Sequence, residues 1–278
     1  MPTTAEKRRN FRGLHEAGCF VIPNPWDIGG ALALEALGFK AIATTSAGLA
    51  FSLGLPDNAV ARDLVLDHCR AMAEASNVPV NADFENGFAD RPEVVADNVR
   101  LCVATGVAGL SIEDATGKSE QPLYDFDFAV ERMKAARAAI DDTGGDTILV
   151  ARSEVFFTKH PEPLREAIRR LVAFADAGAD CLYAPGATKR DEISAIVNAV
   201  APKPVNALVH GPTGLSVADL AGLGVRRISV GGALARSAWG GFLKAARQIA
   251  EEGRFDGFAG APSSKEIVDL FAKVGSRR

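Results

Sequence analysis

The sequence is poor in the residues that carry thiol, redox and metal-thiolate chemistry. Its 278 residues include only four cysteines and four histidines. The cysteines lie far apart, with no Cys-x-x-Cys pair and no histidine at metal-ligand spacing, which argues against a zinc site, a disulfide framework or a dithiol active site. Because small buried cysteine is the commoner case, we interpret all four as reduced structural residues. They are Cys19, Cys69, Cys102 and Cys181.

Long apolar runs and a strong charge of either sign are also missing. No hydrophobic stretch approaches the ~20 residues of a membrane-spanning helix, and residues 1–18 lack the apolar core of a signal peptide. The formal net charge is -4, with no basic stripe interleaved with aromatics, which argues against a general nucleic-acid binder. We expect a cytoplasmic protein that acts on a small molecule and binds neither nucleic acid nor membrane.

What the sequence does contain is a repeated pattern of helix, glycine and buried strand. Each glycine is placed to adopt the left-handed conformation that ends a helix, and a short β-branched run follows it. The pattern occurs at Gly38, Gly106, Gly178 and Gly224. Four further strand-like runs lie near residues 19, 78, 147 and 203. Together they predict eight strands.

Helical patterns alternate with these strands. They cover residues 28–37, 59–75, 92–104, 128–140, 163–177, 191–200 and 217–220. Strict alternation predicts a parallel sheet, and eight repeats favour closure into an α/β fold of the (β/α)8 TIM-barrel type. We see no linker and expect residues 1–278 to form a single domain. Helices over 233–251 and 263–274 form a C-terminal extension, residues 233–278, which is a candidate for packing on a partner subunit.

Polar side chains gather where the predicted strands end. Because the carboxyl ends of parallel strands meet on one face of a barrel, we expect these groups to converge. Converging carboxylates repel unless a cation or shared protons neutralise them, and the oxygen donors favour Mg²⁺. The residues are Asn24, Trp26, Asp27, Thr44, Thr45, Ser46, Asp83, Glu85, Glu113, Asp114, Arg152, Glu154, Asn206 and Ser229 to Gly231. Asp90 with Glu93 also predicts a capping box before the helix at 92–104.

Five stretches, in this order, carry a family resemblance: NPWDIGGALALEALGFKAIATTSAGLAFSLGLPD, VNADFENGFAD, SIEDATG, VARSE and GVRRISVGG. With them the chain resembles the isocitrate lyase and phosphoenolpyruvate mutase superfamily, from about Asn24 to Gly232. The resemblance implies an α/β barrel in which Mg²⁺ binds a 2-oxo acid or its enolate while a carbon-carbon or carbon-phosphorus bond is broken or formed. It also implies a homotetramer whose C-terminal helices are exchanged between neighbouring subunits.

The resemblance implies a metal site at the end of the third and fourth strands. Asp83 and Glu113 match acidic metal-site positions of the family, and Asp57 matches an acidic residue near the metal with a catalytic role. Many members carry Asp where this chain has Asn81, whose amide oxygen can still coordinate Mg²⁺ but brings no charge. Glu85, two residues after Asp83, is a candidate to restore that charge.

The resemblance also implies a substrate-binding set. Arg152 matches the arginine that holds the substrate carboxylate, as suits a forked donor facing a planar anion. Thr45, Ser46 and Ala47 match the loop that cradles the carboxylate or oxyanion, and Trp26 with Asp27 matches a side of the pocket. Asn206, at the end of the seventh strand, is a further substrate-binding candidate.

A second departure from the family concerns the loop after the fourth strand. Isocitrate and methylisocitrate lyases carry a Lys-x-Cys-Gly-His pattern there, whereas this loop reads ATGKSEQPLYD, without Cys or His. A lyase that needs a thiol as general acid would lose its proton source, which argues against those two activities. Lys118 is the only strongly basic group left in the loop and is a catalytic candidate. We expect the loop to close over the site.

The function we expect is a Mg²⁺-dependent lyase or decarboxylase. It would break a carbon-carbon bond in a small 2-oxo or 2-hydroxy dicarboxylate through an enolate intermediate. The alternatives are a carbon-phosphorus enzyme, such as a phosphonopyruvate mutase or hydrolase, and a non-catalytic barrel that binds a 2-oxo acid. A metal-free phosphate-binding barrel is supported only by the pair Gly231 and Gly232.

Overall fold

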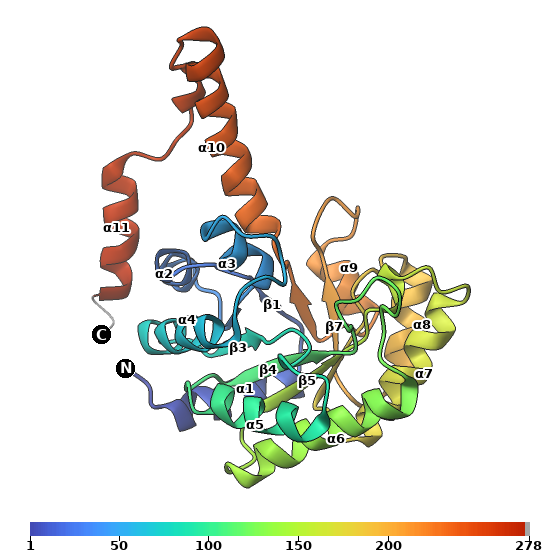
Figure 1. Ribbon diagram of the computed structural model, residues 1–278. Coiled ribbons are helices and arrows are strands. Elements are labelled where there is room, and N and C mark those ends of the chain that lie inside the picture. Colours follow the sequence, from blue (N-terminus) through green and yellow to red (C-terminus); the bar gives the residue numbers. More distant parts are fainter. Residues whose placement is uncertain (276–278) are drawn as a thin grey trace.

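Eight short parallel strands form the centre of the computed structural model, which describes residues 1–275 (Figure 1). They are β1 (Phe20–Ile22), β2 (Ile42–Ala43), β3 (Val80–Asp83), β4 (Gly109–Glu113), β5 (Ile148–Arg152), β6 (Cys181–Tyr183), β7 (Val205–Leu208) and β8 (Arg227–Ser229). Their order is β1-β8-β7-β6-β5-β4-β3-β2. At the seam, the Ala43 amide donates to the Pro23 carbonyl at 3.0 Å, which brings β2 beside β1. The predicted (β/α)8 barrel is confirmed.

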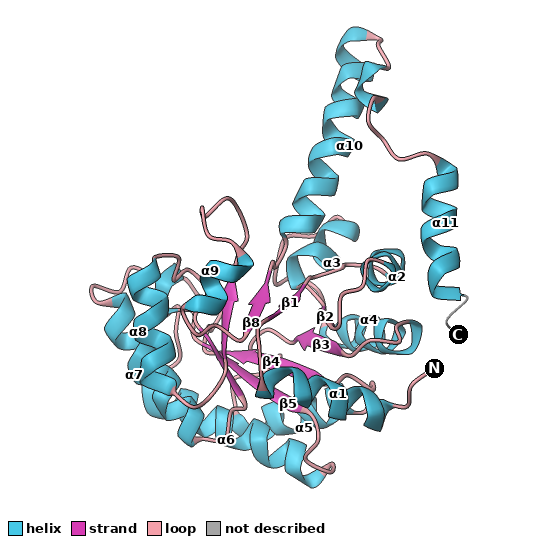
Figure 2. Ribbon diagram, turned by 180° about the vertical axis from the view of Figure 1, so that it is seen from behind, coloured by secondary structure: helices cyan, strands magenta, loops and turns pink. Residues whose placement is uncertain are grey.

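Most of the helices surround this barrel, as Figure 2 shows. The helices are α1 (Thr4–Glu16), α2 (Ile28–Ala36), α3 (Ser46–Ser52), α4 (Arg62–Ala75), α5 (Pro92–Val103), α6 (Phe126–Asp142), α7 (Pro163–Asp176), α8 (Arg190–Val200), α9 (Val217–Gly222), α10 (Ala233–Glu252) and α11 (Ser264–Gly275). The predicted helices are confirmed to within a few residues, but α3 and two short 3-10 turns, η1 (Val155–Phe157) and η2 (Asp256–Phe258), were not anticipated. The last three residues of the predicted C-terminal extension, 276–278, lie outside the described part of the chain.

The glycine-then-strand pattern has the conformation that the sequence predicts. Gly38, Gly106, Gly178 and Gly224 have φ values of +92°, +90°, +99° and +88°. Each lies two or three residues after the end of a helix and leads the chain into the next strand, and a side chain at such φ values would be strained. The predicted capping box at Asp90 is wrong. The N-cap of α5 is Arg91 without a side-chain cap, because Asp90 instead accepts a hydrogen bond from Tyr124.

The amino-terminal end of the barrel is filled by side chains. Phe11 of α1 is fully buried and packs with Ile22, Ile148 and other inward-facing strand residues. Gly109 leaves room for it, since a Cβ there would lie 2.7 Å from Phe11 Cε1 and 2.8 Å from Asn81 Oδ1. The carboxyl end of the barrel is therefore where the polar strand ends can meet a ligand.

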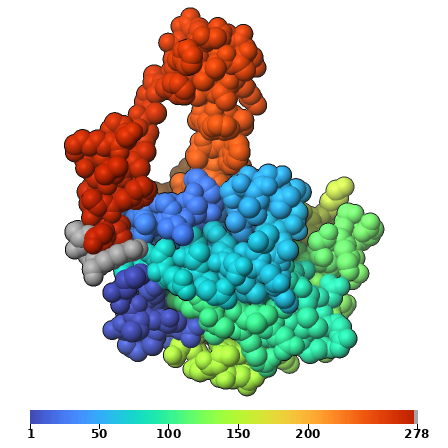
Figure 3. Space-filling model, turned by 60° about the vertical axis from the view of Figure 1, so that its left-hand side comes forward, coloured from blue at the N-terminus to red at the C-terminus, as the bar shows by residue number. Residues whose placement is uncertain are grey.

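Helices α10 and α11 form an arm that projects from the barrel and returns to it at the end of α11. Figure 3 shows an open space between this arm and the rest of the molecule, while the end of α11 returns to pack on α2. Both helices expose large apolar side chains, among them Trp239, Phe242, Val268 and Phe271. None of the helices in residues 1–275 is long and apolar enough to span a membrane.

Candidate active site

Four carboxyl groups surround one guanidinium group at the carboxyl ends of β3, β4 and β5. Arg152 Nε lies 3.3 Å from Glu113 Oε2, and Arg152 Nη1 lies 3.4 Å from Asp83 Oδ1. Arg152 Nε also donates to Glu154. Glu85, on the loop after β3, is close enough for the charge of Asp83 to affect it. We call these five residues the acidic cluster, and they bring together Asp83, Glu85, Glu113 and Arg152 as the sequence predicts.

Asp83 is held in place by the segment between β2 and α3. Its backbone amide donates to Thr44 Oγ1 at 2.8 Å, and its Oδ2 accepts from the Ser46 amide at 3.0 Å. Thr45 caps α3 by accepting from the Gly48 amide at 3.3 Å. The loop predicted to cradle substrate therefore lies directly beside the acidic cluster, although the Ser46 amide already serves Asp83. Ala47 follows in the first turn of α3.

Glu85 adopts a backbone conformation that non-glycine residues rarely take. Its φ is +47°, and its carbonyl accepts from the Glu113 amide at 2.9 Å, so the loop is anchored to β4. A residue in the left-handed region costs roughly 1 kcal/mol or more, and such strain gathers at functional sites. Burial, then the charges of Asp83 and Asp57, raise the pKa of Glu85 to about 8.

The acidic cluster contains four carboxyl groups but only one positively charged group, Arg152. Burial raises the pKa of Glu113 to about 8 even though Arg152 acts to lower it. Burial disfavours the charged form of Arg152 too, but Glu113 and Glu154 outweigh it and hold the arginine pKa well above its ordinary range. These carboxyl groups keep protons near neutral pH because their charged forms are unfavourable here. A bound cation would stabilise the charged carboxylates.

The atoms of the acidic cluster that could coordinate a metal ion are all carboxylate oxygens. Such ligands suit a hard divalent cation. However, within residues 1–275 no group of three or more His, Cys, Asp or Glu side chains is arranged to hold a metal ion by itself. An ion at this position would need water or substrate oxygens as further ligands, which is the usual way in which Mg²⁺ binds.

A buried carboxylate supports the acidic cluster from behind. Asp114 accepts from Ser153 Oγ at 2.9 Å and from the Glu154 amide at 2.8 Å, and it lies 3.3 Å from Arg170 Nη1. Its side chain has no exposed surface. Asp114 therefore fixes the turn that places Glu154 against Arg152, which is a positioning role and not a ligand role.

Several residues predicted for the site lie outside the acidic cluster. Lys118 is 60% exposed, and its Nζ lies 3.2 Å from Asp90 Oδ2. Asp57 is exposed and bonds the neighbouring Asn58 amide at 3.1 Å, although its charge reaches Glu85. Asp27 caps α2 through the Gly30 amide at 2.6 Å.

Trp26 and Asn81 were also predicted for the site and also lie outside the acidic cluster. Trp26 lines an apolar pocket of about 250 Å³ with Trp239 and Phe242 of α10. Asn81 points into the barrel interior, where its Oδ1 accepts from Arg227 Nη1 at 3.2 Å. The amide oxygen proposed as a metal ligand is thus already engaged by a buried guanidinium group.

The loop after β4, residues 115–124, is folded onto the loop after β3. Ala115 and Leu123 form an antiparallel bridge, so the loop is closed on itself. Tyr124 Oη donates to Asp90 Oδ1 at 2.5 Å, and Arg132 lies 3.9 Å from the centre of the Tyr124 ring. Asp90 therefore anchors this loop through both Tyr124 and Lys118.

The neighbouring strand β6 contributes a polar group to the barrel mouth that the sequence did not reveal. Tyr183, the last residue of β6, pairs in register with Arg152 and is 8% exposed. Arg152 Cζ lies 5.4 Å from its ring centre, and Ser229 of β8 is near enough to act on the pKa of its phenol, which Ser229 lowers and burial raises. Asn206 Nδ2 donates to Ser229 Oγ at 2.9 Å, while the buried Asn206 Oδ1 has no partner. The alternation of Cys181 and Tyr183 along β6 is the signal that could have placed this phenol inside the barrel.

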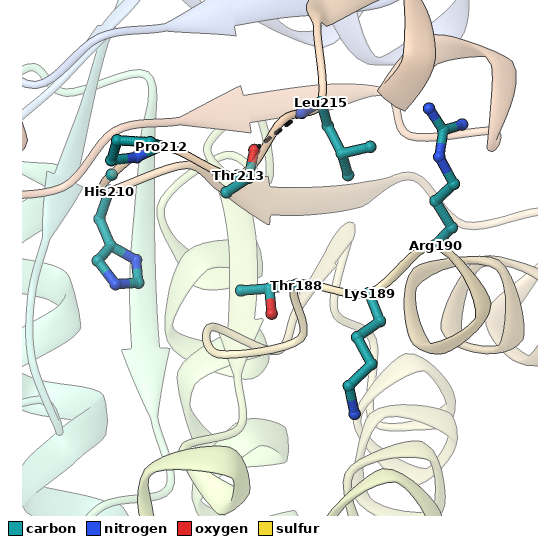
Figure 4. A pocket seen from close by; sticks show the side chains of 8 residues that line it. Thr188, Lys189, Arg190, His210, Pro212, Thr213 and Leu215 are labelled. Atoms are coloured by element: carbon teal, nitrogen blue, oxygen red, sulfur yellow. Dashed lines mark hydrogen bonds between the residues drawn. The ribbon is translucent and has the colours of Figure 1, made fainter.

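A pocket of about 540 Å³ opens between the loops after β6 and β7, on the same face of the barrel. Figure 4 shows His210 and Thr188 on the two loops. Its basic side chains are already paired, since Lys189 Nζ lies 2.8 Å from Glu192 Oε1 and Arg190 is paired with Asp219 at 2.5 Å. The pocket therefore offers hydroxyl and imidazole groups more than free positive charge.

The chain matches a known protein family over most of its length. The family described as phosphoenolpyruvate phosphomutase matches residues 11–250. The chain belongs to this family. The predicted resemblance to the isocitrate lyase and phosphoenolpyruvate mutase superfamily is thereby confirmed, and members of this superfamily are lyases, mutases and hydrolases of carbon-carbon and carbon-phosphorus bonds.

Individual members of the family show how far the likeness extends. An uncharacterised protein of Mycobacterium tuberculosis is 35% identical over 80% of this chain and 81% of its own length. Oxaloacetate decarboxylase of Paraburkholderia xenovorans is 30% identical, with coverage of 72% and 67%.

Solved structures of the family share the fold. One from Burkholderia cenocepacia J2315, described as a lyase or mutase without a proven reaction, is 47% identical with a TM-score of 0.92, covering 97% of this chain and 96% of its own. A phosphonopyruvate hydrolase solved with oxalate and Mg²⁺ is 27% identical, with a TM-score of 0.84 and coverage of 98% and 96%.

Proposed function

We propose that the protein is a Mg²⁺-dependent lyase or decarboxylase that breaks a carbon-carbon bond in a small 2-oxo or 2-hydroxy dicarboxylate through an enolate. The observation that carries the proposal is the acidic cluster, where the pKa values of two carboxyl groups, Glu85 and Glu113, are raised to about 8. Among the relatives, oxaloacetate decarboxylase shares the family over 72% of this chain.

Each residue of the site would have a role that follows from its position. Asp83 would hold the ion directly, with Glu85 and Glu113 bonded to it through water. The bound Mg²⁺ would supply positive charge for the 2-oxo oxygen as it gains negative charge. Arg152, whose charge is fixed among Asp83, Glu113 and Glu154, would orient the substrate carboxylate. The loop of residues 115–124 would exclude water when a substrate is bound.

Carbon-phosphorus chemistry is the second candidate. It is favoured by the phosphonopyruvate hydrolase structure, which binds oxalate and Mg²⁺ in the same fold. A phosphonate and a carboxylate at C3 of a 2-oxo acid leave the same enolate behind when they depart. The pocket between the loops after β6 and β7 would receive the departing group, so substitution of His210 should alter KM more than kcat.

Turnover on a small panel of substrates tests the function. Oxaloacetate, phosphonopyruvate, 2-methylisocitrate and 4-substituted 2-oxo acids would be assayed for pyruvate or glyoxylate release, with Mg²⁺ and with a chelator. We expect metal-dependent turnover of one of them that is lost in Asp83→Ala, while Asp67→Ala, an exposed carboxylate of α4, serves as the matched control. If no substrate is turned over while oxalate still binds, the result would support the non-catalytic binding barrel.

We also propose that the arm formed by α10 and α11 packs on other subunits of a homotetramer, with exchange of the C-terminal helices. Helix α10 projects from the barrel and α11 packs on α2, yet the arm still exposes Trp239, Phe242 and Val268, which water alone would cover in a monomer. Mass measurement in solution tests this, and a monomer would contradict it.

A further inference from the structure

The proposed enolate must gain a proton before it leaves as a 2-oxo acid, and no proton donor has been assigned. The loop after β4 lacks the thiol of the lyases. Cys181, which faces the barrel interior, is fully buried, and burial raises its pKa to about 11. The carboxyl groups of the acidic cluster would be ionised once a cation is bound beside them. A different group is therefore needed.

We propose, resting on the function proposed above, that Tyr183 is the catalytic acid that protonates C3 of the enolate. The phenol stands on the β6 wall, next to Arg152 across the strand pair, so it faces a substrate whose carboxylate Arg152 holds. Burial keeps this hydroxyl protonated at neutral pH, since it raises the tyrosine pKa to about 12.

The neighbours of Tyr183 direct its proton toward the site. Ser229 Oγ accepts from Asn206 Nδ2 at 2.9 Å, which leaves the serine hydroxyl free to donate to the phenol oxygen. The phenol hydrogen is then not consumed by Ser229 and is left for the substrate. The orphaned Asn206 Oδ1 lies on the same wall as an open acceptor for a substrate hydroxyl or a water molecule.

The step balances in atoms and electrons. When the bond from C3 to the departing carboxylate breaks, CO₂ leaves and the electron pair remains as the C2-C3 double bond of the enolate. The pair of that double bond then forms a C3-H bond with the Tyr183 proton, the 2-oxo group is restored, and the O-H pair stays on the phenol oxygen. The phenolate next to Arg152 is transiently stabilised and regains its proton from water through Ser229.

The experiment uses the reverse of this step. In D₂O with Mg²⁺ the full-length protein should exchange the C3 hydrogens of pyruvate for deuterium, followed by NMR. General acid-base groups contribute about 10²- to 10⁴-fold, so Tyr183→Phe should slow exchange by about 100-fold or more. Its oxalate affinity should stay within about threefold, because oxalate mimics the enolate and needs no proton. Cys181→Ala, which alters the same inward face of β6 without removing the hydroxyl, should exchange at close to the wild-type rate.

The outcomes separate the two proposals. If the wild type catalyses no exchange, the enolate function itself fails. If the wild type exchanges and Tyr183→Phe does so equally well, the role of Tyr183 is overturned. Should Tyr183→Phe fail to fold, Ser229→Ala tests the same point. Loss of the group that orients the phenol should slow exchange about tenfold with oxalate binding retained, and an unchanged rate would contradict the proposal.

Discussion

Arg152 is the single positive charge in the acidic cluster, so its removal should destabilise the protein in a pH-dependent way. In Arg152→Met, Asp83, Glu113 and Glu154 lose their shared partner. Removing one member of a buried ion pair costs about 3–5 kcal/mol. Because the Arg152 side chain is 20% exposed, we expect the lower end, about 3 kcal/mol in the free energy of unfolding at pH 8.

The sign of the pH dependence follows from Glu113. Its folded pKa, about 8, already lies above the ordinary value of 4.5, and loss of Arg152 raises it further. A carboxyl group of this kind binds more protons in the folded state, so stability falls as pH rises from about 4.5 through the folded pKa. The cost of Arg152→Met should therefore be smaller at pH 5 than at pH 8, by up to about 1.4 kcal/mol for each unit by which the pKa of Glu113 rises.

Denaturant unfolding at the two pH values, with chelator present, measures this difference. Arg70→Met is the matched control, since Arg70 makes an exposed pair with Asp67 at 2.8 Å. That variant should change stability by less than about 0.5 kcal/mol at either pH. A cost for Arg152→Met that is equal at both pH values, or larger at pH 5, would refute the electrostatic reasoning.

Three further predictions concern the barrel floor and the loop. Burial and nearby guanidinium groups lower the pKa of His15 to about 3, so the urea midpoint should fall as pH drops from about 6.5 toward 3, and His15→Phe should flatten this dependence. Gly109→Ala should lower stability by about 1–3 kcal/mol through its clash with Phe11, and an unchanged melting temperature would contradict this. Asp90→Ala should release Tyr124 and speed limited proteolysis within residues 115–124, whereas unaltered cleavage would show that the loop is held by other contacts.

The barrel could be predicted from the sequence because its signals are local. Glycines such as Gly38 and Gly106 mark the point where a helix stops. The β-branched run after each one is typical of a buried strand in a parallel sheet. Periodicity then gives the order of strands and helices, and the parallel alternation gives the closed sheet. The short helix α3 was missed because its seven residues, with little polar patterning, resemble a loop.

The sequence predicted only those site residues that lie at or just after the ends of strands. Asp83, Glu113 and Arg152 end neighbouring strands and converge for that reason. Lys118 and Asp90 could not be placed, because their pairing depends on how two loops fold over each other across 28 positions of sequence. Tyr183 was overlooked since its importance comes from lying beside Arg152 on the neighbouring strand, which its own sequence neighbourhood does not reveal.

Calorimetric titration of oxalate, as a mimic of the enolate, tests the central claim most directly. We expect that oxalate binds in the presence of Mg²⁺ and that affinity falls by about 100-fold or more with chelator, a loss of roughly 2.7 kcal/mol. Asp83→Ala should lose the same affinity, and Asp67→Ala should retain it. Oxalate binding that is equally tight without a divalent cation, or unaffected by Asp83→Ala, would contradict an enolate-forming site at the acidic cluster.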